Sequence, residues 1–427
     1  DFLYISIASL ASITVLMPFL MDKINGANDG GAKARAFLNS VFSVYMLFMV
    51  VVSGIVALCM PYIARYIAPG FTEGQLHSLV TTSRIMLFSP IFIGLSNLIG
   101  TVTQLFRNFF IFSLSPLFYN VGILIGIIFL YPLCGVYGLA LGVIIGAVLH
   151  LSIQIPTVIR HGFFPQFTSR IEWKEIVHVI TVSAPRTFTL SCNSLAFMVL
   201  IAMASTLKAG SISLFTFSYN LQSVPVGIIG ISYSVAAFPI LVKSFSMKDM
   251  TNFISHITSA ARQIIFWSLP VIALLAVLRA QIVRVILGSN TFSWSDTRLT
   301  AAAVALFIIS LASQSLVLLF VRGYYAAGNT KKPLVVNVFS SVMVVVIAYM
   351  LISLFRTVPS TLINLEALLR VRGVPGTIML ALPLAYALGS LLNFFLIWIL
   401  FKKDFLQGAS SELSKTFIHS LDRKSVV

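Results

Sequence analysis

Long apolar runs separated by short polar segments recur along the whole chain. A helix needs about 20 mostly apolar residues to cross the core of a bilayer, and about eleven runs of that kind can be counted. They cover residues 2–20, 37–64, 84–105, 113–133, 136–159, 176–206, 212–242, 262–288, 299–321, 334–355 and 377–401. The connections are too short to hold a water-soluble domain. The pattern therefore predicts an all-α polytopic membrane protein.

One run departs from the pattern of a lipid-facing helix. Residues 218–239 read SYNLQSVPVGIIGISYSVAAFP, so polar side chains come first and Pro225, Gly227 and Gly230 follow. Such residues are tolerated in a membrane helix where neighbouring protein or water satisfies the backbone. We expect this helix to bend or loosen near Pro225 and to face something other than lipid.

Composition supports a membrane protein, and the charge indicates its orientation. Of the 427 residues, 58% are hydrophobic and 9% are charged, which is too little charge for a water-facing surface. In a soluble protein, a net charge of +16 would indicate a nucleic-acid partner. In a membrane protein, the distribution of Lys and Arg among the loops instead indicates which loops lie in the cytoplasm. Eighteen of the 28 Lys and Arg lie in alternate segments: 21–36, 106–112, 160–175, 243–262, 322–333 and 402–427. The positive-inside rule makes these segments cytoplasmic, with the C-terminal end inside and no nucleic-acid partner expected.

Two halves of the chain resemble each other. PLFYNV at 116–121 and PLVVNV at 333–338 lie 217 residues apart, and each follows a basic residue, Arg107 or Arg322. Further proline and glycine matches occur in the same order, so we predict that 2–20 pairs with 212–242 and that later spans pair in sequence. Coincidence among Leu-rich helices is the alternative.

The pairing predicts two pseudo-symmetric helical lobes around a central cavity, because equivalent helices cross in the same direction. We assign 1–160 to an N-terminal lobe, 161–175 to a cytoplasmic inter-lobe linker, 176–403 to a C-terminal lobe and 404–427 to a cytoplasmic tail. The span 176–206 has no partner in this scheme, and its partner is expected to precede residue 1.

Chemical motifs are few. Carboxylates are absent from the middle of the predicted spans, so coupling through a buried acid is not supported. The sequence contains no HExxH, GxSxG, P-loop or dinucleotide motif. Neither the three cysteines nor the six histidines have metal-ligand spacing. We therefore expect no enzyme, no catalytic residue, no metal site and no cofactor.

Cationic and amide side chains inside the spans remain as candidates. Arg186 lies near the cytoplasmic start of its span, and a guanidinium can hold a phosphate with two hydrogen bonds. Asn193, seven residues on, shares its helical face. Asn220 and Gln222 offer donors and acceptors to a sugar or pyrophosphate. Snorkelling to lipid headgroups is the alternative for Arg186, and interhelical hydrogen bonding is the alternative for the two amides.

Several blocks are specific enough to compare with known families. They are APGF at 68–71, RIMLFSP at 84–90, PLFYN at 116–120, GVYGLALGVIIGAVLHLSIQIP at 135–156, APRTFTLS at 184–191, YNLQSVPVGIIGISYSVAAFP at 219–239 and VRGYYAAGNTKKP at 321–333. These blocks resemble the lipid II flippases, the MurJ or MviN family of the multidrug/oligosaccharidyl-lipid/polysaccharide exporter superfamily. The likeness extends over essentially the whole chain. Because family members carry fourteen helices, it implies that this chain holds the second to the twelfth and is truncated at both ends.

The resemblance implies transport of lipid-linked peptidoglycan precursor, lipid II, from the inner to the outer leaflet by alternating access. It also implies a cationic cavity, and Arg186 and Arg322 match positions that are often basic in the family. Tyr219, Asn220 and Gln222 would then face this hydrated cavity and bind substrate.

Two departures from the family pattern weaken the transfer of binding roles. Many relatives have Asp-Arg or Gln-Arg where Tyr219 and Asn220 stand, and Tyr4 and Ile5 stand where basic residues are usual. Both departures concern substrate binding and leave the predicted fold unchanged.

The expected protein is a monomer in the bacterial cytoplasmic membrane, with a polyprenyl-pyrophosphate-linked glycan and the bilayer as its partners. A flippase for another polyprenyl-linked glycan and a non-transporting scaffold are the main alternatives. A drug exporter of the same fold would need a carboxylate in its cavity. A membrane glycosyltransferase would need catalytic acids and a large outer loop. The longest outer loop, 356–376, contains a single acidic residue, Glu366.

Overall fold

The computed structural model describes residue 16, residues 19–20, residue 23, residues 31–289 and residues 291–406 of the chain. The side chains at 182–183, 185–186 and 189–190 also lie outside this description, as does nearly all of the predicted span 2–20. The chain divides into two compact units, Asp1–Leu195 and Ala196–Val427. The lobe and linker boundaries expected from the sequence, with a linker over 161–175, stay a prediction.

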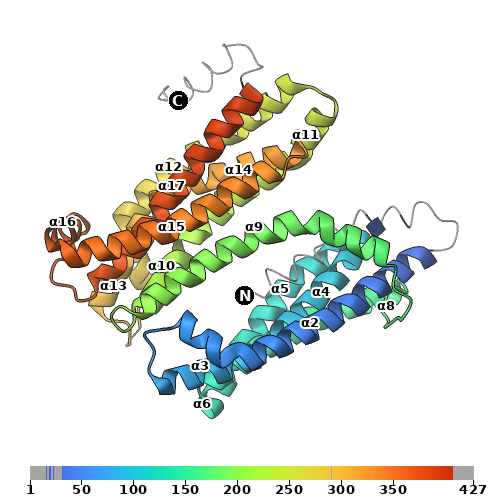
Figure 1. Ribbon diagram of the computed structural model, residues 1–427, viewed down its shortest axis with the longest axis horizontal. Helices are drawn as coiled ribbons and strands as arrows, with labels where there is room; N and C mark the ends of the chain where they lie inside the picture. The colour runs from blue at the N-terminus through green and yellow to red at the C-terminus, as the bar shows by residue number, and fades with distance from the viewer. Residues whose placement is uncertain (1–15, 17–18, 21–22, 24–30, 290, 407–427) are drawn as a thin grey trace. The chain divides into compact units, whose positions relative to one another are not determined.

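The first unit is built from helices joined by short connections (Figure 1). They are α2 (Ala32–Ile67), α3 (Glu73–Met86), α4 (Phe88–Leu105), α5 (Phe109–Ile125), the π-helical turn η2 (Gly126–Leu130), α6 (Tyr131–Cys134), α7 (Val136–Ser152), α8 (Ile155–Arg160) and the first part of α9 (Trp173–Ser205). Phe37, Phe42 and Leu98 belong to a core in which α2 and α4 pack together. This core stabilises one side of the unit by burying apolar surface.

Glycines bring α5 and α7 into close contact. A Cβ atom at Gly122 would overlap the backbone of Gly146, and one at Gly126 would overlap the backbone of Gly142. Small residues at every fourth position let two membrane helices approach until their backbones touch. The glycine-rich sequence of 135–156 therefore has a packing role in this unit.

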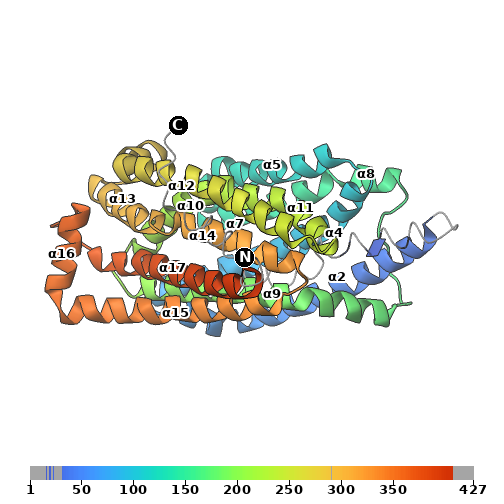
Figure 2. The same cartoon turned by 90° about the horizontal axis from the view of Figure 1, so that it is seen from above.

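The second unit contains the remaining helices (Figures 1 and 2). They are α10 (Ser211–Pro225), the π-helical turn η3 (Val226–Ile231), α11 (Ser232–Ser246), α12 (Met250–Leu287), α13 (Trp294–Ile308), α14 (Leu311–Ala326), α15 (Lys331–Thr357), α16 (Pro359–Leu369), the 3-10 turn η4 (Thr377–Leu380), α17 (Ala381–Phe401) and the π-helical turn η5 (Lys402–Leu406). α15 and α17 run side by side in both views, and Val344 on α15 fills the space that a side chain at Gly389 would need.

The expected loosening near Pro225 is confirmed. The helix from Ser211 to Ser246 widens into the π-helical turn Val226–Ile231 immediately after this proline. Proline cannot donate its backbone hydrogen bond and clashes with the preceding turn, and a wider turn accommodates the defect. The surface that replaces lipid here is α14, because a Cβ at Gly230 would come within 3.0 Å of Ser315.

The membrane spans predicted from the sequence agree with the helices of the described residues. Eight helices are long and apolar enough to cross a membrane, and α13 with α14 forms a further span bent by 42°. α9, a helix of 33 residues, contains residues 176–205 of the predicted span 176–206, and its described apolar part, Ser191–Ser205, is shorter than a membrane span. The expected equivalence of 113–133 with 334–355 and of 136–159 with 377–401 agrees with two closely packed pairs, α5 with α7 and α15 with α17.

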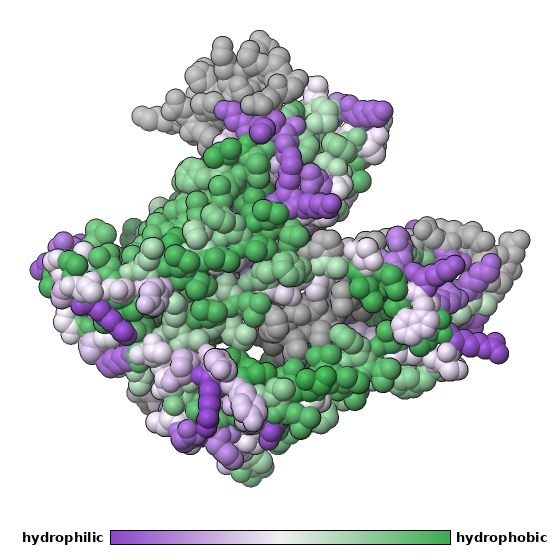
Figure 3. Space-filling model, viewed as in Figure 1, coloured by the Kyte–Doolittle hydropathy of each residue, from purple (hydrophilic) through white to green (hydrophobic). Residues whose placement is uncertain are grey.

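Exposed apolar side chains cover the shafts of the helices. Leu58, Val277 and Val285 are 76%, 75% and 84% exposed. Figure 3 shows hydrophobic residues over the helix shafts on this face and hydrophilic residues gathered near helix ends. Apolar exposure on this scale fits a lipid environment. The described part of the chain is thus a multi-pass membrane protein.

Candidate functional site

A buried polar network joins α4 and α7 in the first unit. Ser96 and Gln154 are fully buried. The Ser96 hydroxyl donates to the His150 carbonyl oxygen at 3.1 Å and lies 2.7 Å from His150 Nδ1. Gln154 Nε2 donates to Ser96 Oγ at 2.6 Å, and Gln154 Oε1 is buried with no hydrogen-bond partner in the described structure. His150, which stands alone in the sequence of its span, therefore belongs to an interhelical network.

The second unit has its own buried amides. Gln314 Nε2 on α14 donates to Gln222 Oε1 on α10 at 3.3 Å and to Ser310 Oγ at 2.8 Å. Asn393 Nδ2 on α17 donates to Asn337 Oδ1 on α15 at 2.9 Å. Amide pairs of this kind connect helices inside a membrane at roughly 1 kcal/mol each.

The predicted substrate residues of the first unit lie on α9. Arg186 is in the helix, and its side chain lies outside the described residues. Asn193 is exposed. Seven residues separate the two, which is close to two helical turns, so their Cα atoms share one face.

The predicted substrate residues of the second unit do not form one exposed surface. Tyr219 is half-buried among aromatic rings, with centroids 4.6 Å from Phe197 and 5.6 Å from Tyr386. Asn220 is exposed, whereas Gln222 is 1% exposed and bonded between helices. The bond between Gln222 and Gln314 is the interhelical hydrogen bond that the sequence left open as the alternative role of Gln222. Arg322 lies on α14 and is half-buried.

Sequence reasoning missed a charged cluster near Arg322. Lys332 Nζ lies 2.6 Å from both carboxylate oxygens of Asp404, and the Tyr324 hydroxyl donates to Asp404 Oδ2 at 2.8 Å. The cluster joins α14, α15 and η5 at one end of the second unit. The run NTKKP at 329–333 was visible in the sequence, but its partner 72 residues later was not.

The polar segment 161–172 is fixed to α2 by hydrogen bonds from its backbone. Gln166 N–H donates to Asn39 Oδ1 at 2.8 Å, and Thr168 N–H donates to Ser43 Oγ at 2.9 Å. Because α2 supplies side-chain acceptors one turn apart, this segment follows the surface of the helix.

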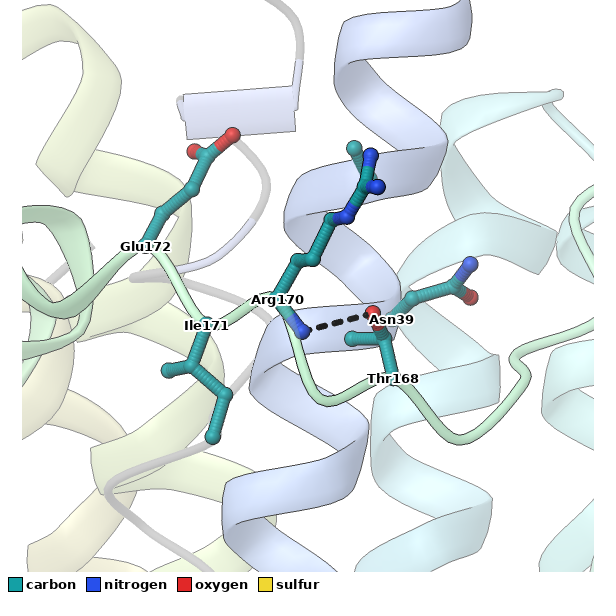
Figure 4. Close-up of a pocket in the computed structure, with 6 residues that line it drawn as sticks. Asn39, Thr168, Arg170, Ile171 and Glu172 are labelled. Atoms are coloured by element: carbon teal, nitrogen blue, oxygen red, sulfur yellow. Dashed lines mark hydrogen bonds between the residues drawn. The ribbon is translucent and has the colours of Figure 1, made fainter.

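A pocket of about 370 Å³ opens where this segment meets α2 (Figure 4). It is lined by Ala36, Asn39, Thr168, Arg170, Ile171 and Glu172. The dashed line in Figure 4 marks the bond of 3.2 Å from Arg170 N–H to Thr168 Oγ1. A neighbouring pocket of about 610 Å³ brings Lys23 and Lys33 to Glu172 and Glu175. Both pockets are open and mix charges of the two signs, so they favour no particular ligand.

Two carboxyl groups meet beside the second pocket. A hydrogen bond with Glu175 raises the pKa of Glu172, with further contributions from partial burial and from the charge of Glu175. Lys23 pairs with Glu175 and lies 3.9 Å from Glu172, which opposes the shift. Folding therefore favours the protonated form of Glu172.

Glu172→Gln is expected to flatten the pH dependence of stability. The raised pKa means that the contribution of Glu172 is fully present below its ordinary value of 4.5 and is lost as the pH rises through the shifted value. Because Glu172 is partly exposed, we expect a change of a few tenths of a kcal/mol. The measurement is the unfolding temperature of parent and variant from pH 4 to 8, with the exposed Glu73→Gln as control. Identical profiles for the parent and Glu172→Gln would contradict the carboxyl pair.

The described residues contain no group of three or more His, Cys, Asp or Glu placed to hold a metal ion. The polar features described above are hydrogen-bonding amides, hydroxyls and isolated charges within a helical membrane protein. These features, together with two units of packed membrane helices, define the class as a polytopic helical membrane protein.

The comparison with protein families identifies the group within this class. The family model "Lipid II flippase MurJ" matches residues 11–426, and the chain therefore belongs to the MurJ family of lipid II flippases. A probable lipid II flippase MurJ of Borreliella burgdorferi is 24% identical over 333 residues, which is 77% of this chain and 65% of that protein. A probable lipid II flippase MurJ of Buchnera aphidicola is 26% identical over 340 residues, 78% of this chain and 65% of that protein. The chain thus spans just under two thirds of the length of these relatives.

Solved structures show the same fold. The inward closed conformation of a lipid II flippase MurJ superposes with a TM-score of 0.73 and 21% identity, covering 100% of this chain and 85% of that one. An inward-facing MATE family transporter superposes with a TM-score of 0.71 and 15% identity, covering 96% of this chain and 89% of that one. The predicted all-α, two-lobe membrane fold is confirmed, as is the predicted family.

Proposed function

We propose that this chain is a flippase that moves lipid II from the inner to the outer leaflet of the bacterial cytoplasmic membrane by alternating access of two lobes. The observation that carries the proposal is the family match over residues 11–426. The transporter fold supports it, since a flippase must enclose a polar headgroup while its surface faces lipid. The protein would act as a monomer, would need no cofactor and would catalyse no covalent step.

The substrate would be held through its pyrophosphate and sugars. We assign the pyrophosphate to Arg186 and Arg322, because a guanidinium presents a planar fork of donors to phosphate oxygens. Asn193, Asn220 and Tyr219 would contact the sugars. Gln222 would contribute through its bond to Gln314, which fixes α10, the helix of Tyr219 and Asn220, on α14.

The topology belongs to the same proposal. The loops rich in Lys and Arg, including the segment 161–175, would lie in the cytoplasm. The end of the second unit that carries α16, called here the α16 end, would then lie at the outer leaflet, and the C-terminal end of the chain would lie inside.

The test is genetic rescue. The full-length gene should restore growth and outer-leaflet lipid II to a bacterium depleted of its own flippase. Arg186→Ala should lower transport at least about tenfold, because a hydrogen bond to a charged group contributes about 1.5–3 kcal/mol. Arg65→Ala removes an equal charge from an exposed helix end and is the control, expected to behave like the parent.

Two outcomes would contradict parts of the proposal. A membrane-inserted protein at normal abundance that fails to rescue growth would exclude lipid II as its substrate and favour another polyprenyl-linked glycan or a scaffold role. Full rescue by Arg186→Ala would remove Arg186 from the binding site and leave the substrate assignment intact.

A further inference from the structure

Four cationic side chains lie on or against the loop 369–376 at the α16 end of the second unit. Arg279 on α12 donates from Nη2 to the Leu369 carbonyl oxygen at 3.0 Å, and Arg298 on α13 donates from Nη2 to the Arg370 carbonyl oxygen at 2.6 Å. Arg370 itself follows α16 in a left-handed conformation with φ 60°. The Lys208 side chain lies against Gly376 in the same loop, where a Cβ would be 3.1 Å from Lys208 Cδ.

The positive charges of this cluster have no carboxylate partner among the described residues. The ion pairs there involve Lys23, Arg65 and Lys332. The two nearby acids are used elsewhere: Glu366 accepts a hydrogen bond from Thr377, and Asp296 caps the start of α13 through Ser293. Carbonyl oxygens satisfy donors without neutralising a charge, and neither acid forms an ion pair with the cluster, so the positive charges outnumber the nearby carboxylates.

The four like charges are also gathered around one loop. Arg279 bonds to the carbonyl oxygen of Leu369, the residue before Arg370, so two like charges gather where α16 ends. Like charges gathered without a counter-ion cost folding energy, and an anionic ligand converts that cost into binding energy. The arrangement is therefore typical of a site built for an anion.

The donor chemistry suits phosphate. One bond to a carbonyl leaves further N–H groups on Arg279 and Arg298, and the helices α12 and α13 fix the direction of both guanidinium groups. Arg370 and Lys208 are exposed and free to close on a ligand. The site thus combines two guanidinium groups held in fixed directions with two exposed basic side chains that can change conformation.

The surroundings of the cluster are those of a membrane interface. Trp294 begins α13 one turn before Arg298 and is 61% exposed, and Leu368 on α16 is 77% exposed. Tryptophan is enriched where headgroups meet the hydrocarbon core. An anion bound here would thus lie at headgroup depth, with apolar side chains beside it for acyl or polyprenyl chains.

We propose that Lys208, Arg279, Arg298 and Arg370 form a binding site for the phosphate-bearing headgroup of a membrane lipid. The site itself is independent of the transport direction; only its placement at the outer leaflet rests on the proposed function. The headgroup belongs either to an anionic phospholipid or to a polyprenyl pyrophosphate, since both present phosphate oxygens beside a hydrocarbon chain.

The test measures lipid binding to the purified full chain in zwitterionic nanodiscs, with phosphatidylglycerol and undecaprenyl pyrophosphate as separate probes. Lys208→Gln/Arg370→Gln removes two exposed charges and retains both carbonyl-bonded arginines, so the fold is kept. Its dissociation constant is expected to rise about tenfold or more, because each basic residue near an anionic surface contributes about 1 kcal/mol. Lys402→Gln/Lys403→Gln removes the same charge from the end of α17 and is the matched control.

The outcomes separate the sources of the headgroup. A loss confined to undecaprenyl pyrophosphate assigns the site to the polyprenyl substrate, and an equal loss for both probes assigns it to phosphate headgroups in general. An equal loss in the control variant, or no loss in Lys208→Gln/Arg370→Gln, would overturn the proposal. Failed genetic rescue together with intact phosphatidylglycerol binding would reject the flippase and retain the site.

Discussion

Gly122→Leu is expected to abolish the packing of the first unit. A side chain at this position would enter the backbone of Gly146 on α7, and no rotamer avoids a backbone clash that begins at Cβ. The helices would have to separate along the whole glycine-rich contact, which also includes Gly126 and Gly142. We expect a loss of about 3 kcal/mol or more, at the upper end for overpacking.

The measurement is the amount of folded, monodisperse protein after detergent extraction, followed by its unfolding temperature. Gly54→Leu is the matched control, because Gly54 lies in helix α2 of the same unit and a Cβ there meets nothing within 4 Å. The control should be at least as stable as the parent, since leucine favours a helix over glycine by roughly 0.5–1 kcal/mol. If Gly122→Leu were as stable as Gly54→Leu, the close contact of α5 with α7 would be wrong.

Ser96→Val is expected to give the second largest loss of stability. Ser96 is fully buried and its hydroxyl connects Gln154 Nε2 with the His150 ring. Valine is similar in size but leaves His150 Nδ1 without the Ser96 hydroxyl and Gln154 Nε2 with only its bond of 3.2 Å to the His150 carbonyl oxygen. A buried group that loses its partner costs about 1–3 kcal/mol. We therefore expect a destabilisation of about 3 kcal/mol.

Thermal unfolding in detergent or nanodiscs measures this loss. Ser152→Ala removes a hydroxyl that donates only to the Val148 carbonyl oxygen of its own helix, so it should change stability by less than about 0.5 kcal/mol. A double variant Ser96→Val/Gln154→Leu should recover part of the loss, because it removes the buried amide that has lost its bond to Ser96. Additive losses in the double variant would show that the two side chains do not interact.

Several features of this protein followed from the sequence alone. The spans are local patterns of apolar residues, so from 37–64 onward most of their ends were predicted to within about five residues, whereas two helical segments begin well before the predicted 84 and 262, at Glu73 and Met250. The wider turn after Pro225 is equally local, because proline removes a hydrogen bond wherever it stands in a helix. The family could be recognised because its motifs are contiguous blocks of residues.

Only the tertiary structure decided which polar residues meet. Gln222 pairs with Gln314 across 92 positions of sequence, Ser96 with Gln154 across 58, and Arg298 with the carbonyl of Arg370 across 72. A helical pattern fixes which residues share a face but not which helix that face contacts or how the two are rotated. Hydrogen bonds lose their energy within an ångström or so of misplacement. The partners of these polar groups are therefore set by the packing between helices, and that packing cannot be derived from the pattern of residues along the chain.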